Sequence, residues 1–168
     1  MRIFIFIISI LFIAEGFAFS ACDDFSASTP TSQFTVDSTN KTVIDTATGL
    51  MWKQCLEGDS DCSGDPLAYS FDDAASVDPP GLIATANEGS GFAGFTDWRL
   101  PNIKELQSIV EEQCSDPAIN STVFPGTPQA ATVLSNSSGY EQWWTIDFTK
   151  GAMITSTSGY IRLVRDTP

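Results

Sequence analysis

The chain has 168 residues, 42% of them hydrophobic, and its 21 acidic side chains outnumber eight basic ones, giving a formal net charge of −13. A surface this acidic repels nucleic acid, anionic lipid and sulfated polysaccharide at long range, so we exclude a role in nucleic-acid binding and disfavour sulfated glycans as ligands. The sequence contains no histidine, which removes the commonest metal ligand and the commonest general base.

Residues 1–20 have the pattern of a secretory signal peptide. Met1-Arg2 precede an apolar run from Ile3 to Ala14, and the small-residue stretch GFAFSA follows. A charged start, an apolar segment of about 7–15 residues and an A-x-A-like site are typical of such peptides, whereas a membrane-spanning helix needs about 20 apolar residues. We therefore predict cleavage after Ser20, no transmembrane span in the mature chain, and a location outside the cell or in the periplasm and cell envelope.

The four cysteines predict two disulfide bonds. Cys22 stands in FSAC, where a bacterial lipoprotein carries its lipidated cysteine, but Phe19 is a poor match to the aliphatic residue usual in that motif. Lipidation would also leave three cysteines, an odd number in an oxidising compartment. The short spacing between Cys55 and Cys62 favours a bond between them, with Cys22 joined to Cys114, although four cysteines permit three connectivities.

The mature chain is expected to begin with an exposed arm over residues 21–33, which are rich in Ser, Thr, Asp and Pro, followed by a domain over residues 34–166. A strand is predicted near QFTVD, and two more in KTVIDTATGLMWKQC, with Gly49 between them. Met51 and Trp52 are predicted core residues of the last of these strands.

The stretch DSDCSGD at residues 59–65 imitates the start of a calcium-binding loop, because acidic and serine side chains alternate and a glycine follows at the turn. The twelfth position of the loop then holds Ser70 instead of the expected bidentate glutamate. We favour a solvated acidic loop and no cofactor. The alternative is a calcium site whose ligands would be Asp59, Asp61 and Asp65.

Two helices are predicted from their capping signals. In SFDDAAS, Ser70 is the N-cap with Asp73 three residues on, and Pro79-Pro80 ends the helix. In NIKELQSIVEE, Asn102 is the N-cap and Glu105 lies at the third helical position, from which its side chain reaches back to the cap. The second helix is amphipathic. Its predicted apolar face is Ile103, Leu106, Ile109 and Val110, and its predicted solvent face is Lys104, Glu105, Glu111 and Glu112.

The segment DWRLP directly precedes the second helix. Pro101 favours an extended backbone at the residue before it, and Asp97 and Arg99 then share one face of the segment. We favour an ion pair between them, or a network of hydrogen bonds that anchors loops, over a role in ligand binding, because the planar guanidinium fork suits such contacts.

The region from Phe124 to Gly139 is rich in Pro, Gly, Ser and Asn and is predicted to be a long surface loop, with a candidate strand at ATVLS. The runs EQWWTIDF, AMITSTS and GYIRLVR follow, separated by glycine turns, and predict an antiparallel meander. Tyr140, Trp143 and Trp144 are candidates for stacking on sugar rings. Adjacent tryptophans on a strand point to opposite faces, so we favour one core and one rim position over a binding platform.

Taken in order, GLMWKQC, GFTDWRLPNIKELQSIVE, a WWTIDF hairpin and GYIRLVRD resemble the family typified by the C-terminal domain of the bacterial collagen-like adhesin Lcl. The resemblance covers roughly residues 34–166 and implies an α+β, C-type-lectin-like fold of two helices and small antiparallel sheets, with paired terminal strands and a long-loop region on one side. Trp98 and Leu100 would be core residues in it, with Asp97 and Arg99 holding the loops. Members are mostly secreted or surface proteins of bacteria, and the adhesin binds sulfated glycosaminoglycans, a ligand that a net charge of −13 does not suit.

These features favour recognition over catalysis. No two acidic residues stand out by their spacing as a pair for glycoside hydrolysis, and the nucleophile motif G-x-S-x-G is absent. We therefore predict a secreted or envelope-associated, non-enzymatic adhesion module that binds a glycan or a surface protein through its long-loop face. The alternative is a structural or interaction domain of the envelope with no small ligand.

Overall fold

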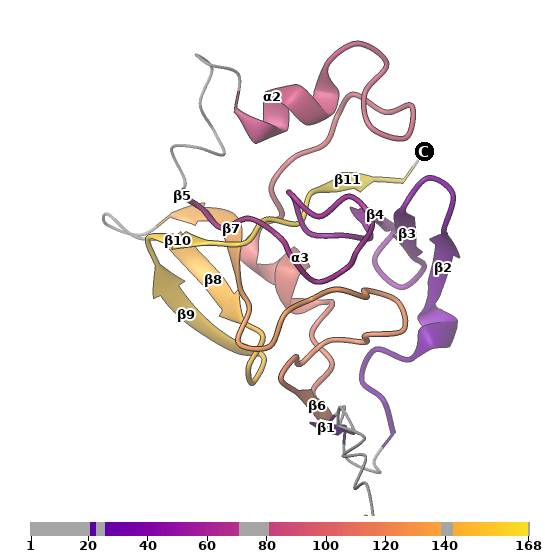
Figure 1. Cartoon of the computed structure of the whole chain (residues 1–168). Coiled ribbons are helices and arrows are strands. Elements are labelled where there is room, and N and C mark those ends of the chain that lie inside the picture. The colour runs from indigo at the N-terminus through magenta and orange to yellow at the C-terminus, as the bar shows by residue number, and fades with distance from the viewer. Residues whose placement is uncertain (1–20, 23–25, 71–80, 139–142, 168) are drawn as a thin grey trace, which may run out of the picture.

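A four-stranded antiparallel sheet joins the beginning of the domain to its end (Figure 1). The computed structural model describes residues 21–22, 26–70, 81–138 and 143–167. The strands of this sheet lie in the order β11-β4-β3-β2, with the bounds β2 Phe34–Asp37, β3 Thr42–Asp45, β4 Leu50–Lys53 and β11 Val164–Asp166. The strands predicted near QFTVD and on both sides of Gly49 are thus confirmed.

The register of this sheet aligns its buried side chains. Trp52 lies opposite Val43 on one side and Val164 on the other, and all three are fully buried. Gly49 makes the turn between β3 and β4 at a φ of 72°, in the left-handed region that favours glycine. The expectation that the terminal strands pair with each other is wrong. Because the consecutive hairpins β2-β3-β4 leave one side of β4 free, β11 pairs there, at the edge opposite β2.

A second sheet contains β7 Thr132–Ser138, β8 Trp143–Asp147 and β9 Ala152–Ser156, in the order β7-β8-β9. It contains only two of the three runs predicted to form a meander. The third run does not pair with β9. Tyr160 instead forms an isolated parallel bridge with Val133 of β7, and the residues Ile161 and Leu163 beyond it are fully buried. The first part of this run, β10 Ser158–Gly159, pairs with β5 Tyr69–Ser70, and its last part is β11.

Two α-helices occur among the described residues, and neither is long and apolar enough to cross a membrane. Helix α3, Ile103–Gln107, has the predicted capping box between Asn102 and Glu105. It is shorter than expected and ends before Ile109 and Val110, which are nevertheless buried. Helix α2, Leu82–Asn87, was not predicted, because its N-cap, Gly81, has no capping side chain.

Two predicted segments lie outside the described residues. They are the helix predicted to follow Ser70, at 71–80, and the signal peptide, at 1–20.

Buried side chains from both sheets and α3 form the core. Met51, Trp52, Trp98 and Leu100 are buried as predicted. The expectation of a surface loop from Phe124 onwards is wrong at its start, because Phe124 is fully buried, with its ring centroid 5.6 Å from that of Phe34. The candidate strand at ATVLS is confirmed, as β7.

Asp97 and Arg99 anchor the chain to its own C-terminal strand. Asp97 accepts a hydrogen bond from Nε of Arg165, at 2.6 Å, while Arg99 donates to Glu105 at 2.7 Å and to Asp166 at 3.1 Å. The anchoring network predicted for DWRLP is therefore confirmed, with partners on α3 and β11. A direct pair between Asp97 and Arg99 is not formed, because Arg165 takes the carboxylate of Asp97.

A buried carboxylate fastens the N-terminal arm. Glu111, which was expected to face solvent, is 3% exposed. It accepts hydrogen bonds from the backbone N–H and hydroxyl groups of Ser28 and Thr29 over distances of 2.8–2.9 Å.

Strand β1 (Ala21–Cys22) pairs with β6 (Cys114–Ser115), and the predicted disulfides Cys22–Cys114 and Cys55–Cys62 are both formed. The short 3₁₀ helix η1, Thr31–Gln33, connects the arm to β2.

Burial raises the pKa of Glu111, but the hydrogen bonds from Thr29 and Ser28 outweigh it and hold that pKa below its usual value. The carboxylate therefore contributes stability above the ordinary glutamate pKa, about 4.3, and this contribution is lost as the pH falls through the lowered pKa of the folded state.

We predict that Glu111→Gln lowers the free energy of unfolding by about 1–3 kcal/mol at neutral pH, because buried hydrogen-bond donors lose a charged acceptor. The difference from the parent protein should shrink in acid. Urea unfolding between pH 3 and pH 7 measures both effects. Glu112→Gln is the matched control, since Glu112 is exposed, and a loss of equal size in that variant would contradict the assignment.

Candidate functional site

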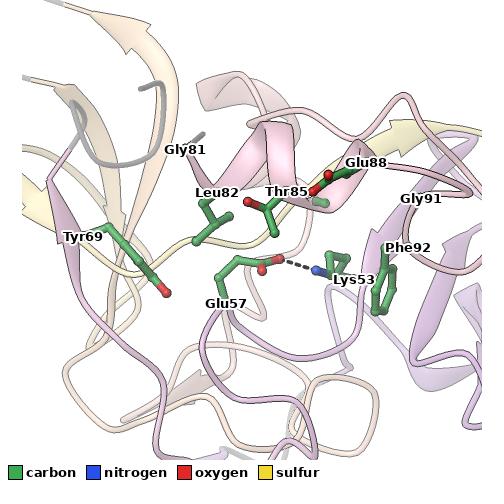
Figure 2. A pocket seen from close by; sticks show the side chains of 10 residues that line it. Lys53, Glu57, Tyr69, Gly81, Leu82, Thr85, Glu88, Gly91 and Phe92 are labelled. Carbon is green, nitrogen blue, oxygen red and sulfur yellow. Dashed lines mark ion pairs between the residues drawn. The ribbon is translucent and has the colours of Figure 1, made fainter. Parts of the chain in front are cut away.

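A cavity of about 850 Å³ opens between α2 and the segment that follows β4. Figure 2 shows the side chains of Thr85 and Glu88 above it, Glu57 and Lys53 below it, and Tyr69 on the side opposite Phe92. Its volume falls within the range of about 300–1,000 Å³ that is typical of small-molecule sites. We call it the main cavity. Its lining residues are Lys53, Glu57, Tyr69, Gly81, Leu82, Thr85, Ala86, Glu88, Gly91 and Phe92.

The lower wall of the main cavity is held by backbone hydrogen bonds to the C-terminal run. The N–H of Lys53, the last residue of β4, donates to the carbonyl of Leu163 over 3.0 Å, and the N–H of Glu57 donates to the carbonyl of Ile161 over 2.8 Å. These bonds fix the chain on both sides of the point where it leaves the sheet. Lys53 and Glu57 are thereby brought to the same wall although they belong to no common helix.

Lys53 and Glu57 form an ion pair at this wall. The Nζ–Oε1 distance is 2.7 Å, and the two side chains are 13% and 12% exposed. Oε1 of Glu57 is buried and receives no well-aligned hydrogen bond, so the contact is electrostatic in character. Nζ of Lys53 also lies 4.0 Å from the ring centroid of Phe92, within cation–π range. The ammonium group is therefore engaged by a carboxylate and by an aromatic ring.

Burial raises the pKa of two side chains that line the main cavity, Glu57 and Tyr69. Burial raises the pKa of Glu57 above its usual value, and the charges of Lys53 and Arg162 only partly offset this effect. Burial, followed by the negative charge of Glu57, also raises the pKa of Tyr69. Tyr69 therefore keeps its phenolic proton at neutral pH and can donate a hydrogen bond.

A smaller cavity of about 320 Å³ adjoins the main one. It shares Lys53, Glu57 and Phe92 with the main cavity, so the ion pair and the ring beneath it form a wall common to both. On its far side it is lined by Lys41 and Asp59. A ligand longer than one ring could thus lie across the common wall.

The acidic loop predicted as a solvated loop or a calcium site makes internal hydrogen bonds. Asp59 is 4% exposed, and its carboxylate accepts from the N–H groups of Ser63 and Gly64 at 2.9 and 2.8 Å. Asp61 accepts from the same N–H of Ser63 at 3.2 Å, and Asp65 is exposed. Within the described part of the chain, no group of three or more acidic or cysteine side chains is placed to hold a metal ion. Calcium binding, the alternative to a solvated loop, would require Asp59 to exchange these hydrogen bonds for contacts with the ion.

The aromatic residues predicted to bind sugar lie elsewhere. Trp143 is partly buried and Trp144 is 40% exposed on β8, which agrees with opposite faces of a strand, and Tyr140 lies outside the described residues. Neither tryptophan lines the main cavity. The residues that do were missed. The i,i+4 spacing of Lys53 and Glu57 was the one local signal, and it gave no indication that Tyr69 and Phe92 would join them.

Comparison with known proteins identifies one family. The sequence model of the Lcl C-terminal domain matches residues 41–165, which is more than half of the chain and includes every residue named around the main cavity. The resemblance seen in the motifs is confirmed. No curated protein and no solved structure gives a significant match.

We predict that Glu57→Gln becomes progressively more stabilising, relative to the parent protein, as the pH rises from 4 to 7. A raised pKa in the folded state means that the parent protein loses stability as the pH rises above the ordinary glutamate pKa, about 4.3, and through the raised value. The glutamine does not titrate. Thermal melting across this range measures the difference. Glu88→Gln, at an exposed position of the same cavity, serves as the control, and a Glu57→Gln difference that is constant with pH would refute the burial argument.

Proposed function

We propose that this chain, which belongs to the Lcl C-terminal domain family, is a secreted or envelope-associated recognition module. It has a C-type-lectin-like fold and binds a glycan in the main cavity. The observation that carries the proposal is a cavity in which two aromatic rings, Tyr69 and Phe92, face carboxylate, hydroxyl and ammonium groups.

This set of side chains suits the chemistry of a sugar. An aromatic ring can stack on the apolar face of a pyranose, while the hydroxyl groups of the sugar need both acceptors and donors. Glu57, Glu88 and Thr85 supply acceptors, and Tyr69 supplies a donor. A few polar groups placed in a largely apolar cleft are what orients small ligands in general.

Further observations support the proposed secreted or envelope location and the proposal that the domain binds without catalysing a reaction. Two disulfide bonds are formed, and such bonds persist in oxidising compartments such as the periplasm and the cell exterior. We propose binding without catalysis, because the sequence selects no nucleophile or acid–base pair, and because the buried carboxylate of Glu57 is already engaged by Lys53.

The proposal predicts that Thr85→Trp weakens glycan binding at least about tenfold, a loss of roughly 1.4 kcal/mol, because an indole at this exposed position of α2 would fill the cavity. Binding to a glycan array, followed by titration of each hit, measures it. Ala84→Trp is the matched control, since Ala84 is an exposed neighbour on the same helix that does not line the cavity.

Equal binding by the Thr85→Trp and parent proteins would refute the site. Trp144→Ala should leave binding unchanged, and a loss there instead would move the site to the exposed face of β8. An array on which the parent protein binds no glycan at all would refute the function.

A further inference from the structure

The main cavity has an unequal charge balance. Among the described residues, its lining includes two carboxylates, Glu57 and Glu88, and a single ammonium group, that of Lys53. The rest of the chain reinforces this sign, because the net charge is −13. Because the net charge of this lining is negative, the cavity favours ligands that carry a positive charge.

Lys53 is poorly placed to reverse this preference by binding an anion. Its Nζ lies 2.7 Å from Oε1 of Glu57 and 4.0 Å from the ring centroid of Phe92. An anionic ligand would have to draw the ammonium away from a carboxylate whose side chain is only 12% exposed and whose Oε1 is buried. That would leave Glu57 as a buried charge without a partner, which is costly.

Glu88 provides a free negative charge at the rim. It is exposed at the C-terminal end of α2, on the side of the cavity opposite Glu57, and no ion pair involves it in the described part of the chain. The smaller cavity differs, because Lys41 and Lys53 there balance Glu57 and Asp59. A cationic group on a ligand is therefore best accommodated on the α2 side of the main cavity.

From this arrangement we propose that the main cavity selects amino sugars, meaning pyranosides with a free, protonated amino group, over neutral and anionic sugars, through the carboxylate of Glu88. This inference rests on the proposed glycan-binding function and adds the class of ligand. The amino group would lie at Glu88, while the ring would contact Tyr69 and Phe92.

Three trisaccharides of similar length separate the ligand classes, namely β-1,4-linked glucosamine, β-1,4-linked N-acetylglucosamine and α-1,4-linked galacturonic acid. We expect calorimetric titration at pH 6 and low ionic strength to show the glucosamine trimer binding about threefold to fivefold more tightly than the N-acetylated trimer, the range expected of an exposed ion pair. The galacturonic acid trimer should bind most weakly. The preference should diminish in 0.5 M salt, because exposed charges are screened.

Variants test whether Glu88 is responsible. Glu88→Gln should remove most of the preference for the glucosamine trimer, because the amide keeps an oxygen that accepts a hydrogen bond but carries no charge. Its affinity for the N-acetylated trimer should fall by less than its affinity for the glucosamine trimer. Glu112→Gln removes the same charge from an exposed site outside the cavity and should preserve the preference.

The inference and the proposed function fail in different ways. Tighter binding of the neutral or the anionic trimer, abolished by Thr85→Trp, would overturn the preference for amino sugars while supporting glycan binding in the cavity. A preference that survives Glu88→Gln unchanged would also overturn the inference. Binding of the glucosamine trimer that is insensitive to Thr85→Trp would instead place the site elsewhere and refute both.

Discussion

The arrangement of the main cavity depends on a guanidinium group buried in the core. Arg162 is 1% exposed. It donates hydrogen bonds to the carbonyls of Lys53 and Gln54 and to Oγ1 of Thr127, and it lies 4.8 Å from the ring centroid of Phe124. Burial lowers its pKa to about 9, although the charges of Glu57 and Asp59 work in the opposite direction. A charge buried in this way is tolerated only while its hydrogen bonds are kept.

These hydrogen bonds hold the segment that forms the lower wall. Lys53 and Gln54 stand where the chain leaves β4, and their carbonyls would otherwise point into the core unpaired. With the carbonyls bound, the backbone continues towards Glu57, and the Lys53–Glu57 pair forms over Phe92. Arg165, three residues after Arg162, holds a second loop segment in a similar way. It donates a hydrogen bond to Asp97 and lies 4.0 Å from the ring centroid of Phe95. The motif YIRLVR thus fastens two loop segments to one terminal run.

Features that depend on neighbouring residues were predictable from the sequence. The capping box of Asn102 and Glu105, the turn at Gly49 and the disulfide of Cys55 with Cys62 involve residues at most seven positions apart. Features that depend on distant residues were mostly not, and the bond between Cys22 and Cys114, 92 positions apart, followed only from pairing Cys55 with Cys62 first. The helical spacing of Glu111 predicted that it faces solvent. It is buried instead, because it binds Ser28, which lies 83 positions away in the sequence. The main cavity was missed for the same reason, because its wall is assembled by a buried arginine more than 100 positions from the carbonyls that it binds.

Amide hydrogen exchange of an Arg162→Lys variant tests most directly whether this arginine assembles the cavity. An ammonium cannot reproduce the planar fork that contacts three acceptors. We expect faster exchange at the amides of Lys53 and Glu57 than in the parent protein, beyond any change at Ile146 in β8, because local opening should be confined to the segment that has lost its anchor. Unchanged exchange at Lys53 and Glu57, or an equal increase throughout β7 and β8, would contradict this expectation.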